Sequence, residues 1–220
     1  EVRVRRIIVF DFDGVLVDSN GIKQRAFFDL FPETVHPIIT KVISDIPYHW
    51  SRFDILRSIV TALPPLKGGV DEYERKYRAI VRNAIIARGV IPGVYELLRE
   101  LRTSGRTLYL NSATPAEALS ELIDALDLRR CFSDVFGRPP TKLVNLMDIM
   151  ARERAKTNEL VMIGDGKEDR VSSKALDILF IGIANEFNGW ANTTCFPIAG
   201  NVFSAIDRLK EIEQRDESNK

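Results

Sequence analysis

Six polar residues of this sequence stand where strands are expected to end, and together they could carry out phosphoryl chemistry. They are Asp11, Asp13, Ser112, Lys142, Asp165 and Asp169. Ligands of an open α/β sheet bind beyond the carboxyl ends of its strands, so we expect these side chains to meet at one edge. Several carboxylates in one place repel each other unless a cation joins them. Oxygen ligands of this kind select Mg²⁺, which often also contacts a substrate phosphate.

The other polar groups complete a set suited to moving a phosphoryl group. A carboxylate such as Asp11 can act as a nucleophile and form an aspartyl phosphate. The Ser112 hydroxyl and the Lys142 ammonium group can bind the remaining phosphate oxygens and stabilise the charge that develops during transfer. The residue types therefore indicate phosphoryl transfer to an aspartate.

The elements that must position these residues alternate between strands and helices. Short apolar runs predict strands over residues 5–10, 107–111, 133–137, 159–165 and 178–184. Amphipathic periods predict helices over residues 94–105, 115–128, 141–156, 167–177 and 202–215. Thr114 is the expected N-cap of the second helix, and residues 216–220 are expected to fray. This alternation predicts an α/β fold with a doubly wound, mainly parallel, Rossmann-like sheet.

Residues 18–90 differ in character from the rest of the chain. They show helical periodicity and almost no strand signal, and prolines and a glycine pair separate the helices. We expect a small all-helical cap domain over 18–90, inserted into a catalytic core formed by 1–17 and 91–220. Glycine-bearing connectors over residues 14–21 and 89–93 suit a hinged lid that closes over a substrate.

The most unusual stretch of the insertion is IPYHWSRFD, which spans residues 46–54. Tyr48, His49, Trp50 and Arg52 combine aromatic surface, a titratable imidazole and a fixed cation. As a hypothesis, this stretch faces the active site, and His49 or Arg52 contacts the leaving group. The alternative is that its aromatic residues pack in the core of the insertion.

Composition narrows the classes of function. The 220 residues are 45% hydrophobic and 28% charged, which is ordinary for one core with an accessory domain. Basic and acidic residues number 31 each, so the zero net charge supports neither nucleic-acid binding nor docking on an anionic membrane. The first apolar run stops at Asp11, which predicts a strand and not a signal peptide. Cys131 and Cys195 lie far apart, which predicts free thiols in a cytoplasmic protein.

Four motifs resemble those of the haloacid dehalogenase superfamily of phosphohydrolases. DFDGVLVD resembles the DxD motif, LNSAT a strand ending in Ser or Thr, GRPPTK a lone lysine that begins a helix, and VMIGDGKED the GDxxxD motif. They occur in the family's order and cover essentially the whole chain. The insertion after the first motif resembles the helical cap of the phosphoglycolate-phosphatase-like branch.

The resemblance implies a catalytic role for four residues. Asp11 would be the nucleophile, and Asp13 would be the general acid and then the general base. Ser112 and Lys142 would bind phosphate oxygens, and Lys142 would also offset the charge of Asp11. In this family an aspartate at position 13 favours a phosphate ester over a haloacid or a phosphonate.

The resemblance also implies a Mg²⁺ site. Asp11, the backbone carbonyl of Asp13 and the carboxylate of Asp165 would hold the ion. Asp169 would support the metal through water or through contacts with its ligands.

Simpler structural roles compete with these assignments. Asp13 is followed by glycine, and Asp-Gly is a common turn pair, although this leaves Asp11 unexplained. Ser112 could be a loop hydroxyl or a cap, and Thr114 competes for both roles. Lys142 could be a solvated lysine, although the helix dipole disfavours a cation at a helix N-terminus. Asp169 could simply favour the first turn of a helix.

These observations favour a Mg²⁺-dependent phosphatase that acts on a small phosphorylated metabolite through a phospho-aspartate. A phosphomutase with the same machinery is the nearest alternative, because the sequence does not show whether the cap admits water or a second substrate hydroxyl. A signalling receiver domain lacks the second aspartate and the cap, and the intact motifs disfavour a catalytically silent member. We expect a monomer or homodimer with no nucleic-acid or membrane partner.

Overall fold

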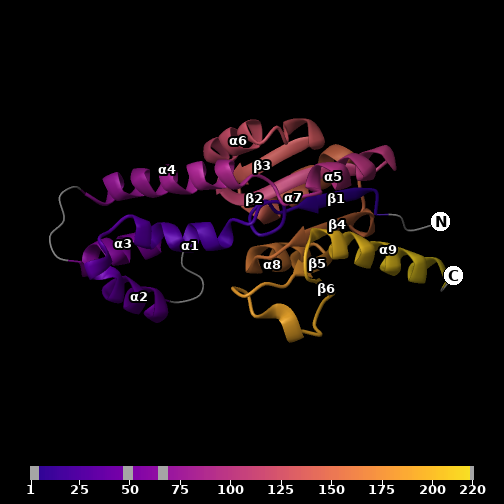
Figure 1. Ribbon diagram of the computed structural model, residues 1–220. Coiled ribbons are helices and arrows are strands. Elements are labelled where there is room, and N and C mark those ends of the chain that lie inside the picture. The colour runs from indigo at the N-terminus through magenta and orange to yellow at the C-terminus, as the bar shows by residue number, and fades with distance from the viewer. Residues whose placement is uncertain (1–4, 47–51, 64–68, 219–220) are drawn as a thin grey trace. The chain divides into compact units, whose positions relative to one another are not determined.

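The computed structural model describes residues 5–46, 52–63 and 69–218 (Figure 1). The chain divides into two compact units. The core unit combines the chain up to Asp18 with the chain from Gly89 onward, and the helical unit comprises Ser19–Arg88. Each unit has buried apolar side chains of its own.

The described part of the core unit is built on a six-stranded sheet in the order β3-β2-β1-β4-β5-β6, and every neighbouring pair is parallel. This order places the first strand centrally and extends the sheet outward from it in both directions, which confirms the predicted doubly wound α/β fold. The strands are β1 (Ile7–Phe10), β2 (Thr107–Pro115), β3 (Asp134–Arg138), β4 (Leu160–Gly164), β5 (Leu179–Ile183) and β6 (Ile198–Ala199).

Three elements of the core unit show differences from the prediction that have an identifiable cause. β2 continues to Pro115 through a register irregularity that follows Asn111, where the strand was expected to end. β6 was not predicted, because a strand of two residues has no readable periodicity. Helix α9 (Val202–Ser218) includes part of the expected frayed tail, since Arg5 forms an ion pair with Asp216 at 2.8 Å.

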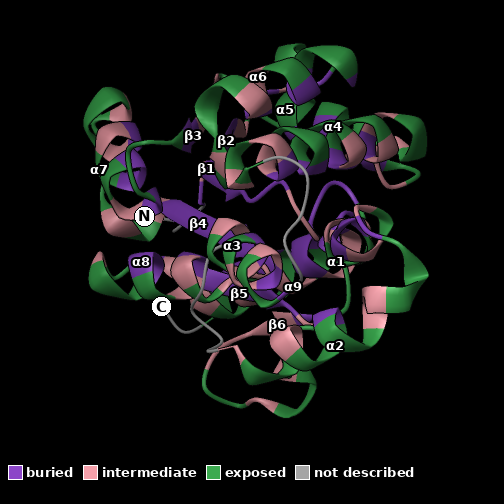
Figure 2. Cartoon of the chain, turned by 90° about the vertical axis from the view of Figure 1, so that its left-hand side faces the viewer, coloured by how far each residue is buried: buried purple, intermediate pink, exposed green. Residues whose placement is uncertain are grey.

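All four residues of β1 are fully buried, so both faces of the sheet are covered. The covering elements are helices. Leu146 and Ile149 of α7 (Lys142–Glu153) pack with Val9 and Met162 on one face. Alternate side chains such as Phe10 point to the other face. Figure 2 shows the buried strands beneath helices whose outer surfaces are exposed. The other α-helices of this unit are α5 (Val94–Thr103), α6 (Ala116–Ala125) and α8 (Lys167–Ala175).

The described residues of the helical unit form helices and turns and contain no strand. Its core includes two stacked aromatic pairs, Phe27 with Tyr77 at 4.9 Å and Phe31 with Tyr73 at 5.0 Å between ring centroids. The helices are α1 (Asn20–Asp29), α2 (His36–Asp45), α3 (Arg52–Ala62) and α4 (Val70–Arg88), with a 3-10 turn at Glu33–Val35.

The stretch singled out in the insertion is described only in part. Tyr48, His49 and Trp50 lie outside the described residues. Arg52 is the first residue of α3, and one nitrogen of its guanidinium group is buried without a hydrogen-bond partner among the described residues. The hypothesis that this stretch contacts a leaving group stays a prediction.

Two expectations drawn from composition can be compared with the fold. Cys131 and Cys195 are both free, as predicted. Over the three described ranges, we find no helix with the length and apolar character needed to cross a membrane.

Candidate active site

The carboxyl end of β1 lies between the ends of β2 and β4. Phe10, the last residue of β1, is level with Leu110 of β2 and Ile163 of β4. Asp11 follows directly, and its backbone N–H donates to the Ile163 carbonyl at 2.9 Å. Because Asp11 is only 5% exposed, its carboxylate is held in a nearly buried position at the centre of the sheet edge.

The loop after β1 turns Asp13 back toward β2. Gly14 has a φ of +69°, a conformation that favours glycine, and its N–H donates to a carbonyl three residues further on at 2.8 Å. Thr114, near the end of β2, donates its hydroxyl hydrogen to Asp13 Oδ2 at 3.0 Å. The expected N-cap role of Thr114 is wrong, because Pro115 occupies the N-cap position of α6 and the Thr114 hydroxyl is engaged by Asp13.

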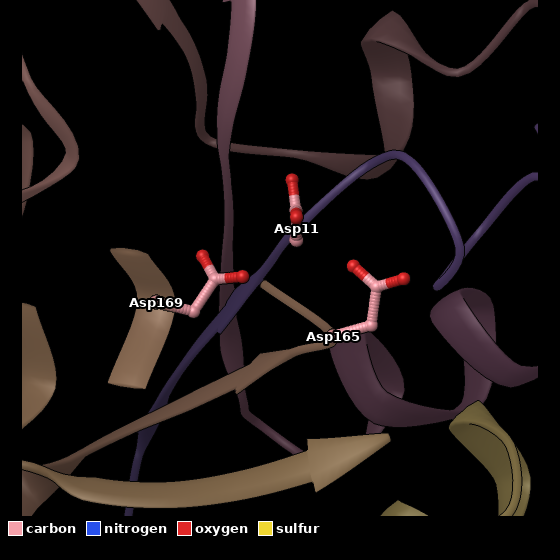
Figure 3. Close-up of side chains that lie close together, drawn as sticks. All are labelled: Asp11, Asp165 and Asp169. Atoms are coloured by element: carbon pink, nitrogen blue, oxygen red, sulfur yellow. The ribbon is translucent and has the colours of Figure 1, made fainter. Parts of the chain in front are cut away.

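Three carboxylates form a cluster at this edge (Figure 3). Asp11, Asp165 and Asp169 each offer an oxygen, and these oxygens lie within 4.8 Å of one another. They come from the end of β1, the residue after β4 and the first turn of α8. Asp169 is fully buried and Asp165 is half-buried. The structure therefore concentrates negative charge from three separate segments in a largely buried place.

Lys142 is the buried cation beside this cluster. Its Nζ lies 2.9 Å from Asp11 Oδ2 and 2.5 Å from Asp169 Oδ1, and the residue is 2% exposed. Burial alone would lower the pKa of Lys142, but the two carboxylates outweigh burial, so this pKa is raised. Burial and the charge of Asp11 raise the pKa of Asp169 well above its ordinary value, although Lys142 opposes this shift. The alternative of a solvated lysine at position 142 is wrong.

A buried amide pair holds the first residue of α7, which is Lys142. Asn111 Nδ2 donates to the Lys142 carbonyl at 3.0 Å, and Asn145 Nδ2 donates to Asn111 Oδ1 at 2.9 Å. The backbone N–H of Lys142 donates to Glu168 Oε1 at 3.3 Å. Bonds from β2 and α8 therefore fix the main chain of Lys142, so its ammonium group does not depend on a flexible side chain alone.

Ser112 is fully buried near the end of β2. Its hydroxyl oxygen accepts a hydrogen bond from the Thr114 N–H at 3.1 Å, which is a local turn contact of the kind that the structural alternative describes. The same bond joins Ser112 to the residue that contacts Asp13. A role of Ser112 in binding phosphate stays a prediction.

Comparison with known proteins identifies the family. Residues 5–177 match the family model of the haloacid dehalogenase-like hydrolases. The chain belongs to this family. It is 24% identical over 196 residues to a phosphoglycolate phosphatase of Vibrio parahaemolyticus. This alignment covers 83% of this chain and 85% of that protein. It is 25% identical over 193 residues to the probable phosphatase IndB of Dickeya dadantii. This alignment covers 82% of this chain and 81% of that protein.

Solved structures of this fold superpose on nearly the whole chain. A putative β-phosphoglucomutase of Thermotoga maritima has a TM-score of 0.71 at 18% identity and covers 94% of this chain and 99% of its own. The putative haloacid dehalogenase hydrolase YfnB of Bacillus subtilis, solved with bound magnesium, has a TM-score of 0.68 at 14% identity. The match covers 93% of this chain and 98% of that one. The predicted superfamily and its phosphoglycolate-phosphatase-like branch are confirmed by the family match together with the curated relatives.

The acidic cluster of this haloacid dehalogenase-like protein has the donors that Mg²⁺ requires. Carboxylate oxygens are hard ligands, and three of them lie within reach of one small cation. Three clustered carboxylates and the one ammonium group of Lys142 would leave uncompensated negative charge, which a divalent cation would neutralise. The residues present therefore fit a magnesium ion.

Gly164 provides the space that Asp169 occupies. A Cβ atom on Gly164 would lie 2.4 Å from both Cγ and Oδ2 of Asp169, which is closer than real contacts allow. The Gly166 N–H donates to the same Oδ2 at 3.0 Å. The glycine of the GDxxxD motif is therefore needed because Asp169 packs against its backbone, which the motif spacing did not reveal.

Replacing Gly164 by alanine should displace Asp169 and lower the free energy of unfolding by about 1–3 kcal/mol, as expected for an overpacked buried site. Urea unfolding of the metal-free protein would measure the change. Gly200→Ala is the matched control, because a Cβ there meets nothing within 4 Å. Equal stabilities for the two variants would contradict the packing argument.

The sequence analysis did not identify Asn185, which is a hydrogen-bond partner of Asp165. Asn185 Nδ2 donates to Asp165 Oδ2 at 2.7 Å, and Asn185 follows β5 closely. The rule that functional groups follow strand ends would have found it, since the fifth predicted strand stops at residue 184. The residue at this strand end is an uncharged amide, unlike the carboxylates that mark the ends of the first and fourth predicted strands.

Proposed function

We propose that this protein is a Mg²⁺-dependent phosphatase that hydrolyses the phosphate monoester of a small metabolite through a phospho-aspartate. The observation that carries the proposal is the nearly buried Asp11 carboxylate, 2.9 Å from the Lys142 ammonium group and clustered with Asp165 and Asp169. The phosphatase names of the curated relatives support the same reaction class.

In the proposed first step, Asp11 attacks the phosphorus atom of the bound ester. A bond forms between phosphorus and a carboxylate oxygen of Asp11 as the bond to the leaving oxygen breaks. Asp13 gives its proton to that oxygen, so the product leaves as an alcohol. Lys142, and Ser112 if it binds the phosphate as predicted, would stabilise the negative charge on the phosphoryl oxygens.

In the proposed second step, water attacks the phosphorus atom of the phospho-aspartate. Asp13, now ionised, takes a proton from this water while the bond between phosphorus and Asp11 breaks. Inorganic phosphate and the free Asp11 carboxylate are the products. The hydrogen bond from Thr114 supports this role, because it orients the Asp13 carboxylate for both proton transfers.

Asp11, Asp165, the backbone carbonyl of Asp13 and, given its place in the cluster, Asp169 are the proposed ligands of Mg²⁺. When bound, the ion would neutralise charge on the phosphate and on the clustered carboxylates. We further propose that the helical unit is a cap that selects the substrate, that the protein is cytoplasmic, and that its partners are small phosphorylated metabolites.

Hydrolysis is preferred over the phosphomutase alternative. The named relatives that align with most of this sequence are phosphatases. The similarity to a putative β-phosphoglucomutase concerns the fold, at 18% identity. A mutase would return a phosphorylated isomer of the substrate, whereas a phosphatase releases inorganic phosphate.

The proposal is tested by assaying phosphate release from a panel of esters with Mg²⁺ and with EDTA. The panel should include 2-phosphoglycolate, hexose phosphates and p-nitrophenyl phosphate. We expect release from at least one ester, loss of that activity in EDTA and recovery with added Mg²⁺. The proposal fails if no ester releases phosphate, or if EDTA leaves the rate unchanged.

A further inference from the structure

The loop after β5 holds Asp165, and β5 lies on the side of β4 that is away from β1. Asn185 Nδ2 donates to the Asp165 carboxylate Oδ2 at 2.7 Å. Asn188 Nδ2 donates to the Asp165 backbone carbonyl at 3.1 Å and to the Ile183 carbonyl at 2.8 Å. Both the side chain and the main chain of Asp165 are therefore tied to the end of the neighbouring strand.

The loop that carries Asn185 is itself held by its own amide side chains. Asn185 Oδ1 accepts from the N–H groups of Phe187 and Asn188 at 2.9 and 3.1 Å. Asn188 Oδ1 accepts from the N–H groups of Asn185 and Trp190, both at 3.1 Å. Every polar atom of the Asn185 side chain is thus engaged, so the donor that meets Asp165 is fixed in orientation before any ligand arrives.

The anchoring of this loop continues into the core. The Trp190 ring meets the rings of Phe180 and Phe196 at 5.8 and 5.1 Å between centroids. Phe180 belongs to β5 and is buried. The loop is therefore tied to the sheet at both ends, which is a firmer support than an exposed loop normally provides.

We propose that Asn185 is a positioning residue that sets the rotation of the Asp165 carboxylate for Mg²⁺. The inference rests on the metal site of the proposed function. A carboxylate only accepts hydrogen bonds, so the carboxamide nitrogen of Asn185 must face it. Partners of metal-ligating carboxylates commonly change metal affinity by about 10–100-fold when removed.

The test measures binding of Mg²⁺ to metal-free protein by calorimetry, with Mn²⁺ and its electron paramagnetic resonance signal as a second readout. Asn185→Ala should weaken binding by about tenfold. Asn185→Ser keeps a hydroxyl that can support the turn but is too short to reach Asp165, so it should weaken binding equally. Asn201→Ala is the matched control, because Asn201 makes similar loop bonds to Ser204 at the start of α9.

A double-mutant cycle separates this role from general loop stability. In an Asp165→Ala background, adding Asn185→Ala should change the metal affinity by less than about twofold, because the group that it positions is absent. Wild-type affinity in Asn185→Ser, or equal losses in Asn185→Ala and Asn201→Ala, would overturn the inference. If Asp165→Ala itself binds Mg²⁺ as tightly as wild type, the metal site of the proposed function fails instead, and the inference with it.

Discussion

Replacing Asp11 by asparagine is expected to lower the rate of phosphate release by more than about 10³-fold. The amide has the shape of the carboxylate, but it is too weak a nucleophile to form a stable bond to phosphorus. No phosphorylated protein should be trapped when substrate is mixed with the variant and quenched in acid. Intact-protein mass spectrometry measures the phosphoryl adduct, and a phosphate-release assay measures the rate.

Two further variants define what this result means. Asp207→Asn makes the same chemical change on the exposed face of α9, where the carboxylate is 72% exposed, and it should leave the rate unchanged. Asp13→Asn should slow the hydrolysis of alkyl phosphates by about 10²–10⁴-fold, and less for p-nitrophenyl phosphate, whose leaving group needs no acid. Trapped phospho-protein in Asp11→Asn at wild-type yield would exclude Asp11 as the nucleophile.

Replacing Lys142 by methionine is expected to produce the largest loss of stability. Methionine fills a similar volume but leaves Asp11 and Asp169 without the cation that lies within 2.9 Å of both. Removing one partner from a buried ion pair costs about 3–5 kcal/mol, because the remaining charges stay buried and unpaired. Urea unfolding in EDTA measures the change. Lys167→Met, at the exposed first position of α8, is the control and should change stability little.

The same substitution should make stability fall more strongly as the pH rises through the pKa of Asp169. In the wild type the pKa of Lys142 is raised, so its contribution is complete below the ordinary lysine pKa and is lost only as the pH rises through the raised value. Without Lys142, Asp169 loses the cation that opposes the effect of burial and of Asp11, so its pKa should rise further. Ionised Asp169 then destabilises the folded state.

The Lys142→Met variant should therefore be more stable at about pH 5 than at about pH 7.5, because the folded protein binds the extra proton. Added Mg²⁺ should recover part of the loss at the higher pH, since it supplies positive charge to the same carboxylates. A variant whose stability in EDTA matches the wild type at both pH values would show that Lys142 does not pair with the cluster.

Much of the core fold could be predicted because its signals are local. Apolar runs of strand length stop at the carboxylates Asp11 and Asp165, and β1 and β4 end directly before these residues. Amphipathic periods between the strands predict the crossover helices. Predictions failed where a contact with a distant segment overrode the local pattern. Thr114 reads as an N-cap, yet its hydroxyl meets Asp13, 101 residues earlier in the chain. The predicted tail forms helix where Asp216 meets Arg5.

The sequence by itself determined which residue types stand at the strand ends, since strand length and motif spacing are properties of neighbouring residues. Only the tertiary structure decided that Lys142 is buried between two carboxylates and that Asp169 packs against the backbone of Gly164. The same holds for the hydrogen bond from Asn185 to Asp165. The physical reason is that burial and charge pairing depend on which segments the parallel sheet brings together. Those distances are fixed when the chain closes around its core, and no local pattern of residues encodes them.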